Sequence, residues 1–363
     1  MLPGPGKIYR PTTALSARLV LLFTLLFLLD GHSAFGVKNT RAVDHDSLAV
    51  EISFATNRNR IDTDDIAQTF GDEAGPLSFG TCAVQFTPIK VLQSAARHIS
   101  LRFPTEIEDI ADLRLLEEEE FWPRLQKQVD IQGRKFVFYI HGYKMDFAKS
   151  CRRAALMQRE LGPDVTLLLF AWPSQDNFAL YARDETMLKK SVGDIKHLLN
   201  RILATFGHGR TNVVGHSLGT RGINAAIADL APQDQPLFDQ LVLVAPDMDR
   251  PGFESTLPEL SRAVTGITIY VSDNDGPLRV SREVHGEPRL GEAGETLMLF
   301  EGIETIDVSE VPQRDIYGHN YHYFNERVIA DLRHLLTEGA RAAERPRLSE
   351  QKKNGRTYWK MLE

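Results

Sequence analysis

One serine in this sequence stands in a pattern that lets serine act as a nucleophile. The residues Gly215-His216-Ser217-Leu218-Gly219 have the G-x-S-x-G spacing of a nucleophile elbow, a tight strand-to-helix turn that exposes the serine hydroxyl. Flanking glycines relieve the crowding of that turn and let the helix approach closely. The five residues alone are a weak signal because the pattern also arises by chance. Their surroundings therefore decide what they mean.

The residues on either side of Ser217 have the order that an elbow requires. Thr211–Val214 is a short apolar run that predicts a strand. After the serine, Ile223, Ile227 and Leu230 recur with helical spacing. Strand, serine and helix thus follow one another, which favours Ser217 as a nucleophile.

A serine hydrolase of this topology also needs an acid that follows the serine in the chain. Asp275 follows the predicted strand Ile267–Val271 and is the first choice for the carboxylate that orients a histidine. Asp247 and Asp273 also follow predicted strands and stay open as alternatives. Aspartates in turns often only cap their own loops, so position alone does not separate the three.

The base should be a histidine that comes after the acid. Four histidines follow Asp275, namely His285, His319, His322 and His334. His334 lies in a helical pattern, and His285 comes too soon after Asp275 to follow another strand. His319 follows a glycine in a loop and is the preferred general base, while His322 stays the alternative because it could instead pack among aromatic residues.

The same kind of hydrolase stabilises a negative oxygen with two backbone amides, the oxyanion hole. The N–H of Leu218, directly after the serine, is one candidate. The turn after the apolar run Lys135–Ile140 offers the second, at Tyr143 or Lys144. His141 in this turn is expected to be structural because it precedes the nucleophile. Trp172, Phe178 and Tyr181 could line the substrate pocket, although Trp172 could equally pack under the elbow.

The elements that must position these residues alternate between strands and helices. Apolar runs predict strands at Leu48–Phe54, Gly80–Lys90, Lys135–Ile140, Val165–Phe170, Leu241–Val244, Ile267–Val271 and Glu304–Val308. Helical stretches are predicted at Ile107–Val129, Phe147–Leu161, Leu180–Phe206 and Ser217–Leu230. This alternation predicts an α/β fold with a doubly wound, mostly parallel sheet and helices on both faces. Reactive groups in such sheets gather beyond the carboxyl ends of the strands.

The two ends of the chain are expected to lie outside the hydrolase domain, residues 45–338. Basic residues precede the apolar run Leu19–Leu29, and small residues follow it, which predicts a signal peptide over residues 1–36 and an exported protein, periplasmic or secreted. An uncleaved signal that anchors the chain in the inner membrane is the alternative. Residues 339–363 are basic, few of them are apolar, and they are expected to form a flexible, solvated tail.

Composition limits the function further. The 363 residues are 42% hydrophobic and 25% charged, which is typical of a globular protein with a large core. A net charge of -7 argues against nucleic acid as a partner and favours a small-molecule ester substrate. No H-E-x-x-H motif or Walker A loop occurs, so no cofactor or metal is expected. Cys82 and Cys151 could form a disulfide after export or stay as buried thiols.

Several short stretches, in this order, resemble a bacterial α/β-hydrolase family of largely uncharacterised function within the esterase and lipase superfamily. They are Phe138–Tyr143, Phe170–Ser174, Gly215–Gly219, Ala245–Asp247, Tyr270–Asp275, Arg289–Gly291 and Gly318-His319. The resemblance spans roughly Val50 to Leu336. It implies the α/β-hydrolase fold with Ser217, Asp275 and His319 as the catalytic triad.

Two functions remain open from the sequence. The first is a serine hydrolase that cleaves carboxylic esters or thioesters through an acyl-enzyme. The second is a non-catalytic envelope protein that uses the same fold for binding or scaffolding, because a fold alone does not guarantee chemistry.

Overall fold

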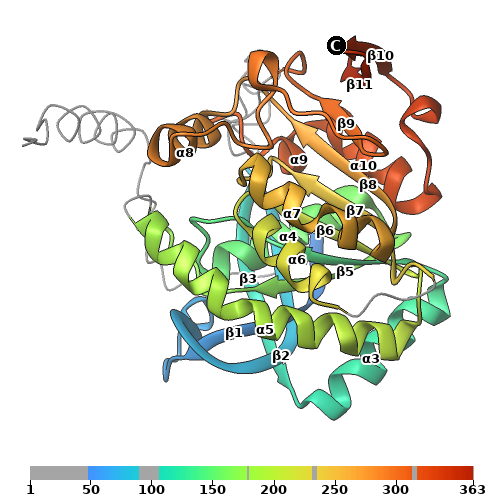
Figure 1. Ribbon diagram of the computed structural model, residues 1–363. Coiled ribbons are helices and arrows are strands. Elements are labelled where there is room, and N and C mark those ends of the chain that lie inside the picture. The colour runs from blue at the N-terminus through green and yellow to red at the C-terminus, as the bar shows by residue number, and fades with distance from the viewer. Residues whose placement is uncertain (1–47, 90–105, 178–179, 231–234, 313–316, 363) are drawn as a thin grey trace, which may run out of the picture. The chain divides into compact units, whose positions relative to one another are not determined.

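The computed structural model describes residues 48–89, 106–177, 180–230, 235–312 and 317–362. In these ranges the chain forms an 11-stranded sheet with helices on both faces (Figure 1). The strands are β1 (Leu48–Arg60), β2 (Phe70–Pro88), β3 (Glu106–Leu116), β4 (Lys135–Ile140), β5 (Val165–Ala171), β6 (Thr211–His216), β7 (Phe238–Val244), β8 (Val264–Val271), β9 (Glu304–Asp307), β10 (Leu348–Lys353) and β11 (Arg356–Met361). The helices are α3 (Glu118–Gln132), α4 (Phe147–Leu161), α5 (Tyr181–Phe206), α6 (Gly219–Ala228), α7 (Arg250–Ala263), α8 (Gly276–His285), α9 (Tyr321–Phe324) and α10 (Glu326–Glu338).

The centre of the sheet is parallel and buried on both faces. The strand order is β10-β11-β9-β8-β7-β6-β4-β5-β1-β2-β3, and β6, which leads to Ser217, lies in the middle. Every residue of β5 and of β6 is buried, as central parallel strands between two helix layers should be. The predicted fold class is confirmed.

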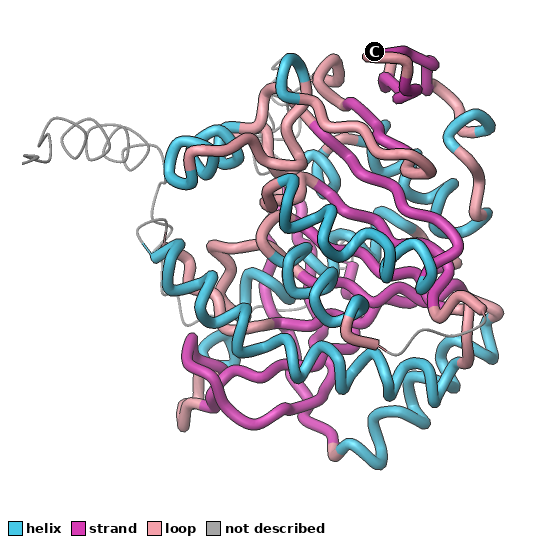
Figure 2. Tube along the Cα trace, viewed as in Figure 1, coloured by secondary structure: helices cyan, strands magenta, loops and turns pink. Residues whose placement is uncertain are grey.

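Two helix layers cover the sheet, one on each face (Figure 2). Side chains of α3, α5, α6 and α7 share one apolar cluster with the sheet. Side chains of α4, α9 and α10 share a second cluster, on the other face. Each layer thus removes one face of the parallel strands from water, which is the main stabilising term for such a fold.

The first three strands extend the sheet beyond β5, and two of their pairings are antiparallel. β1 pairs with β5 in parallel, whereas β2 and β3 add antiparallel neighbours. Residues 107–116 were expected to be helical, and that prediction is wrong. Their burial alternates with the period of a strand whose one face is partly covered, and the helix begins only at Glu118. Three consecutive acidic residues, Glu118 to Glu120, fill the first turn of α3, where negative charge suits the helix dipole.

The carboxyl-terminal segment also belongs to the sheet, which corrects the prediction of a flexible tail at 339–363. β10 and β11 form a hairpin, and β11 pairs in parallel with β9. Asn354 and Gly355 both have positive φ, 51° and 78°, as a two-residue hairpin turn requires. Met361 is buried, and so is Arg345, which donates to Asp331 and Tyr270. The domain therefore continues past residue 338.

Some predictions concern residues that the structure does not describe. The signal peptide at 1–36 and the pocket residue Phe178 lie outside the described residues. Among the described residues, no helix has the length and apolar character needed to cross a membrane. Cys82 and Cys151 are both buried free thiols in this structure.

The hairpin makes a testable contribution to stability. A chain that ends at Pro346 lacks β10 and β11, and we expect its free energy of unfolding to fall by about 3 kcal/mol or more, because the apolar contacts of Met361 and Trp359 are lost. Urea unfolding followed by circular dichroism measures the change. A control chain that ends at Met361 should unfold like the full chain. Equal stability of the chain that ends at Pro346 would show that the segment is dispensable.

Candidate active site

Ser217 lies on a strained turn at the end of the central strand. Its φ is 52°, in the left-handed region that residues with a Cβ rarely adopt. Its N–H donates to the carbonyl of Val244 at 2.9 Å, and its carbonyl accepts from the N–H of Asp247 at 3.3 Å. The side chain stands between β6 and α6, the position that the elbow motif predicts.

The glycines around Ser217 are required by close contacts, with backbone at Gly219 and with side chains at Gly215 and Gly142. A Cβ on Gly219 would lie 2.3 Å from the carbonyl oxygen of His141. A Cβ on Gly215 would lie 2.8 Å from the side chain of Ile223, and one on Gly142 would lie 2.8 Å from the Cβ of Ser217. The turn after β4 therefore packs directly against the elbow.

The structure brings His319 and Asp275 together. Nδ1 of His319 lies 2.7 Å from Oδ2 of Asp275, and both side chains are buried. The other oxygen of Asp275 accepts from the N–H of Leu278 at 3.0 Å, so Asp275 is also the N-cap of α8. With both carboxylate oxygens bound, the plane of the carboxylate is fixed relative to the imidazole.

His319 lies beside the elbow. Its carbonyl oxygen is 3.3 Å from Nε2 of His216, the residue before Ser217, and the two rings have centroids 4.7 Å apart. Ser217, His319 and Asp275 are thus collected at one edge of the sheet, although they come from three different loops.

The other candidate histidines have different surroundings. His322 is buried, packs 3.8 Å from the Tyr323 ring between centroids, and has no hydrogen-bond partner for either ring nitrogen among the described residues. Burial lowers its pKa, as does the nearby His319. His334 contacts Glu338 on the surface of α10, and His285 contacts Glu185.

His141 is a structural residue of the turn after β4. Its ring stacks on Trp172 with an interplanar angle of 13°, and Trp172 donates to the His141 carbonyl at 2.8 Å. Burial lowers the pKa of His141 to about 3, so the ring is neutral at pH 7. Trp172 is fully buried under this turn. Of the suggested pocket residues, Tyr181 stands nearer the site, edge-on to Tyr143 with ring centroids 5.3 Å apart.

The two candidate amides at the turn after β4 differ in their partners. The N–H of Lys144 donates to the buried carboxylate of Asp184. Tyr143 precedes it, and this turn touches Ser217 through Gly142. Leu218 is buried and directly follows Ser217 at the start of α6. The Lys144 amide is therefore already committed to Asp184.

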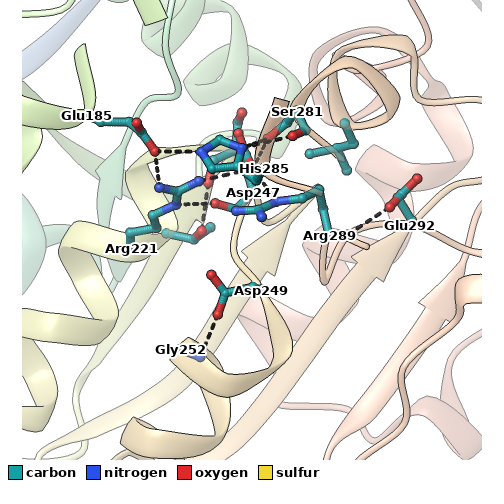
Figure 3. Close-up of polar contacts among 12 residues, drawn as sticks. Glu185, Arg221, Asp247, Asp249, Gly252, Ser281, His285, Arg289 and Glu292 are labelled. Atoms are coloured by element: carbon teal, nitrogen blue, oxygen red, sulfur yellow. Dashed lines mark hydrogen bonds and ion pairs between the residues drawn. The ribbon is translucent and has the colours of Figure 1, made fainter. Parts of the chain in front are cut away.

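Asp247, the alternative acid, is the centre of a buried polar network (Figure 3). Its Oδ1 accepts from Nε of Arg289 at 2.8 Å and from Ser281 at 2.7 Å, while its Oδ2 accepts from Tyr181 at 2.5 Å. Arg221 adds a contact at 3.3 Å to Oδ1 and a hydrogen bond from Nε to the Asp247 carbonyl. Burial raises the pKa of Asp247, but the two guanidinium groups outweigh it and the net shift is downward.

Sequence reasoning missed this network. Asp247 was considered only as an acid, and its partners were given no role in holding it. The partners are 26 to 66 residues away in the chain and come from four different segments, so no local spacing connects them. Asp273, the third possible acid, is exposed and its N–H donates to Ser309.

The residues described here contain no group of three or more histidine, cysteine or acidic side chains arranged to hold a metal ion.

The fold and the elbow at the end of its central strand define an α/β hydrolase. The family described as alpha/beta hydrolase of unknown function (DUF900) matches residues 117–338, well over half of the chain, and the chain belongs to that family. No curated protein matches it.

Several solved structures are similar to the chain. One is an esterase from Pyrobaculum calidifontis, with 10% identity, coverage of 62% of this chain and 94% of that one, and a TM-score of 0.32. A second is the thioesterase RedJ from the prodiginine pathway of Streptomyces coelicolor, with 12% identity, 55% and 85% coverage, and a TM-score of 0.31. A third is a zinc-bound, cold-adapted esterase from an Arctic intertidal metagenomic library, with 14% identity, 79% and 94% coverage, and a TM-score of 0.35. At this low similarity none of these structures identifies catalytic residues in this chain.

The contact at Gly219 predicts a large cost for one methyl group. Gly219→Ala should lower the free energy of unfolding by about 2 kcal/mol or more, because a Cβ 2.3 Å from a backbone oxygen forces the elbow and the neighbouring turn apart. Gly193→Ala in α5 is the matched control, since a Cβ there meets nothing within 4 Å, and it should stabilise by up to about 1 kcal/mol. Chemical unfolding of both variants measures this. A neutral Gly219→Ala would contradict the close packing.

The network at Asp247 makes a second prediction. Asp247→Asn leaves the buried guanidinium of Arg289 without its counter-charge, while the half-buried Arg221 keeps Glu185, and the change should destabilise by about 3–5 kcal/mol at pH 7. Because the folded pKa of Asp247 is lowered, its contribution is present above the unfolded pKa of about 4 and is lost as the pH falls through the folded value. The gap between wild type and variant should therefore shrink in acid.

Asp249→Asn is the control for this measurement. Asp249 caps α7 by accepting from Gly252 at 2.7 Å, and asparagine caps helices equally well, so the change should cost less than about 0.5 kcal/mol (Figure 3). Unfolding free energies from pH 3 to 8 test both variants. A pH-independent gap for Asp247→Asn would show that its charge is not the stabilising feature.

Proposed function

We propose that this α/β hydrolase cleaves carboxylic esters or thioesters with Ser217 as nucleophile, His319 as general base and Asp275 as the orienting acid. The observation that carries the proposal is the 2.7 Å contact between Nδ1 of His319 and Asp275, beside a serine held at φ 52°. Ser217 is a nucleophile that needs a base. His319 is a base whose tautomer is fixed by the carboxylate of Asp275.

The reaction follows from these positions. Asp275 accepts the Nδ1–H of His319, which leaves Nε2 as the basic nitrogen. His319 takes the proton of the Ser217 hydroxyl while the oxygen attacks the carbonyl carbon of the substrate. The imidazolium that forms is stabilised by Asp275 and then gives its proton to the leaving alcohol or thiol. Water attacks the acyl-enzyme with the same histidine as base, which regenerates Ser217.

The negative charge in both steps develops on the carbonyl oxygen of the substrate. The N–H groups of Leu218 and Tyr143 are proposed to bind that oxygen. Backbone donors suit this task because they are fixed before the reaction and need no reorganisation during it.

The proposed partner of the protein is a small-molecule ester. The apolar N-terminal run supports export, to the periplasm or beyond, or an anchor in the inner membrane.

A fluorophosphonate probe tests the nucleophile. It should label the wild-type protein at Ser217 and should not label Ser217→Ala. The same variant should lose at least about 10⁴-fold in kcat toward p-nitrophenyl esters, as loss of a triad nucleophile does. A folded wild-type protein that the probe does not label would favour the non-catalytic, ligand-binding function of the fold.

Matched pairs of variants test the acid and the base. Asp275→Asn should lower kcat by about 10⁴-fold because the histidine then takes the wrong tautomer, whereas Asp273→Asn should leave kcat within about twofold. His319→Gln should be as inactive as Ser217→Ala, and His322→Gln should keep measurable turnover. Steady-state kinetics on esters of graded acyl length also reports the preferred chain length. An active Asp275→Asn would exclude this carboxylate.

A further inference from the structure

The segment Gly142–Asp146, which we call the oxyanion loop, is held in an unfavourable conformation. Lys144 has φ 60°, although it is not glycine. Non-glycine residues stay in the left-handed region only where the surroundings impose it, and such strain gathers at functional sites. The loop connects β4 to α4 and carries the amide of Tyr143. The residues that impose its shape are therefore of interest.

One of them is Asp184, a fully buried carboxylate at the start of α5. It accepts from the N–H of Lys144, from the hydroxyl of Ser174 at 2.5 Å and from the N–H of Gln175 at 3.2 Å. The Ser174 hydroxyl in turn accepts from the N–H of Met145 at 3.2 Å. Two consecutive amides of the oxyanion loop are thus tied, directly or through Ser174, to one carboxylate.

The second is Arg58, which is 1% exposed and lies in β1. Its Nη2 donates to the carbonyl of Met145 at 2.6 Å, and its Nη1 donates to the carbonyls of Ser174 and Gly71 at 2.9 and 3.0 Å. The pairing register of β1 with β2 shifts on both sides of Arg58, and such irregularities redirect side chains. Burial lowers the pKa of Arg58 to about 10, so the guanidinium is charged at pH 7.

Asp184 and Arg58 hold different backbone groups of the loop. The carboxylate binds the N–H of Lys144 directly and that of Met145 through Ser174, and the guanidinium binds the Met145 carbonyl, so the peptide groups on both sides of Met145 are held. Hydrogen bonds to charged groups are stronger than neutral ones, and a planar guanidinium sets directions as well as distances. Arg58 comes from the strands that precede residues 117–338, the part that matches the family. The first strands therefore reach the active site.

We propose that Arg58 and Asp184 are positioning residues of the oxyanion hole, which fix the Tyr143 peptide so that its N–H meets the developing negative oxygen. The inference rests on the proposed function. A misplaced donor weakens transition-state binding and leaves substrate binding nearly unchanged, because a ground-state carbonyl lies off the donor position. Replacing residues that only stabilise the fold would not weaken transition-state binding while leaving substrate binding unchanged.

The variants Arg58→Met, Arg58→Lys and Asp184→Asn test the proposal. Arg345→Met is the matched control for Arg58, because Arg345 is equally buried and binds Asp331, Tyr270 and Glu304, none of which belongs to the oxyanion loop. Asp194→Asn is the control for Asp184, since Asp194 lies on the same helix but accepts from Asn57. Melting temperature, kcat and KM for a p-nitrophenyl ester, and the Ki of an aryl boronic acid are measured for each.

We expect Arg58→Met and Asp184→Asn to lower kcat by about 10- to 100-fold, with KM within about threefold, and to weaken boronic acid binding by a similar factor. Arg345→Met should lower the melting temperature at least as much while kcat stays within about twofold. Asp194→Asn should likewise keep its kcat. Equal kcat losses in Arg58→Met and Arg345→Met would overturn the inference. Absent labelling of wild type by a fluorophosphonate would instead reject the proposed function.

A crystal structure of the wild-type protein with the boronic acid bound to Ser217 gives a second test. This test does not depend on whether the variants fold. A boronate oxygen should lie within about 3.1 Å of the amide nitrogens of both Tyr143 and Leu218. The contacts of Arg58 and Asp184 with the loop should persist in the adduct. A boronate oxygen bound elsewhere, or an adduct in which these contacts are broken, would overturn the positioning role.

Discussion

The left-handed backbone of Ser217 is the constraint on which the site depends, because a residue with a Cβ keeps φ 52° only when its surroundings exclude relaxed conformations. Here the exclusion is steric. The turn after β4 touches the elbow at Gly142, and the first turn of α6 touches His141 at Gly219, with no room for a methyl group at either contact. Three backbone segments therefore hold one another in place. None of them can relax unless the other two move.

Buried charged side chains also hold the site in place. Among them, two buried carboxylates have pKa values shifted in opposite directions because their surroundings differ. Burial raises the pKa of Asp184, whose close donors are the Ser174 hydroxyl and backbone amides. The pKa of Asp247 is lowered instead, because Arg221 and Arg289 outweigh burial. A carboxylate already committed to two guanidinium groups is a poor counter-ion for a new imidazolium. Asp275 instead faces His319, whereas the N–H of Asp247 binds the carbonyl of Ser217 at the elbow.

The sequence predicted those features that contiguous residues encode. The elbow around Ser217 and the apolar runs of β4 to β8 are local patterns. The rule that loops meet at the carboxyl ends of parallel strands brought Asp275 and His319 forward but left alternatives open, and the family resemblance then implied these two. One local signal, the period of β3, was misread, and another, the Asn354-Gly355 turn of the last hairpin, was overlooked. Arg58 could not be found in this way, since it lies 87 and 116 residues from the loops that it binds and nothing in its neighbourhood marks it.

Helix α8 connects the support of the elbow to the orientation of the base. Its first turn is capped by Asp275, and the N–H of Gly276 donates to the carbonyl of Tyr317, two residues before His319. Further along the same helix of 10 residues, Ser281 donates to Asp247, whose own N–H binds the carbonyl of Ser217. A short helix moves as a rigid body, so the position of Ser281 on Asp247 constrains where Asp275 meets the imidazole. The proposed nucleophile Ser217 and the proposed base His319 are therefore set by one connected framework, although they are 102 residues apart in the chain, as their numbers in the sequence show.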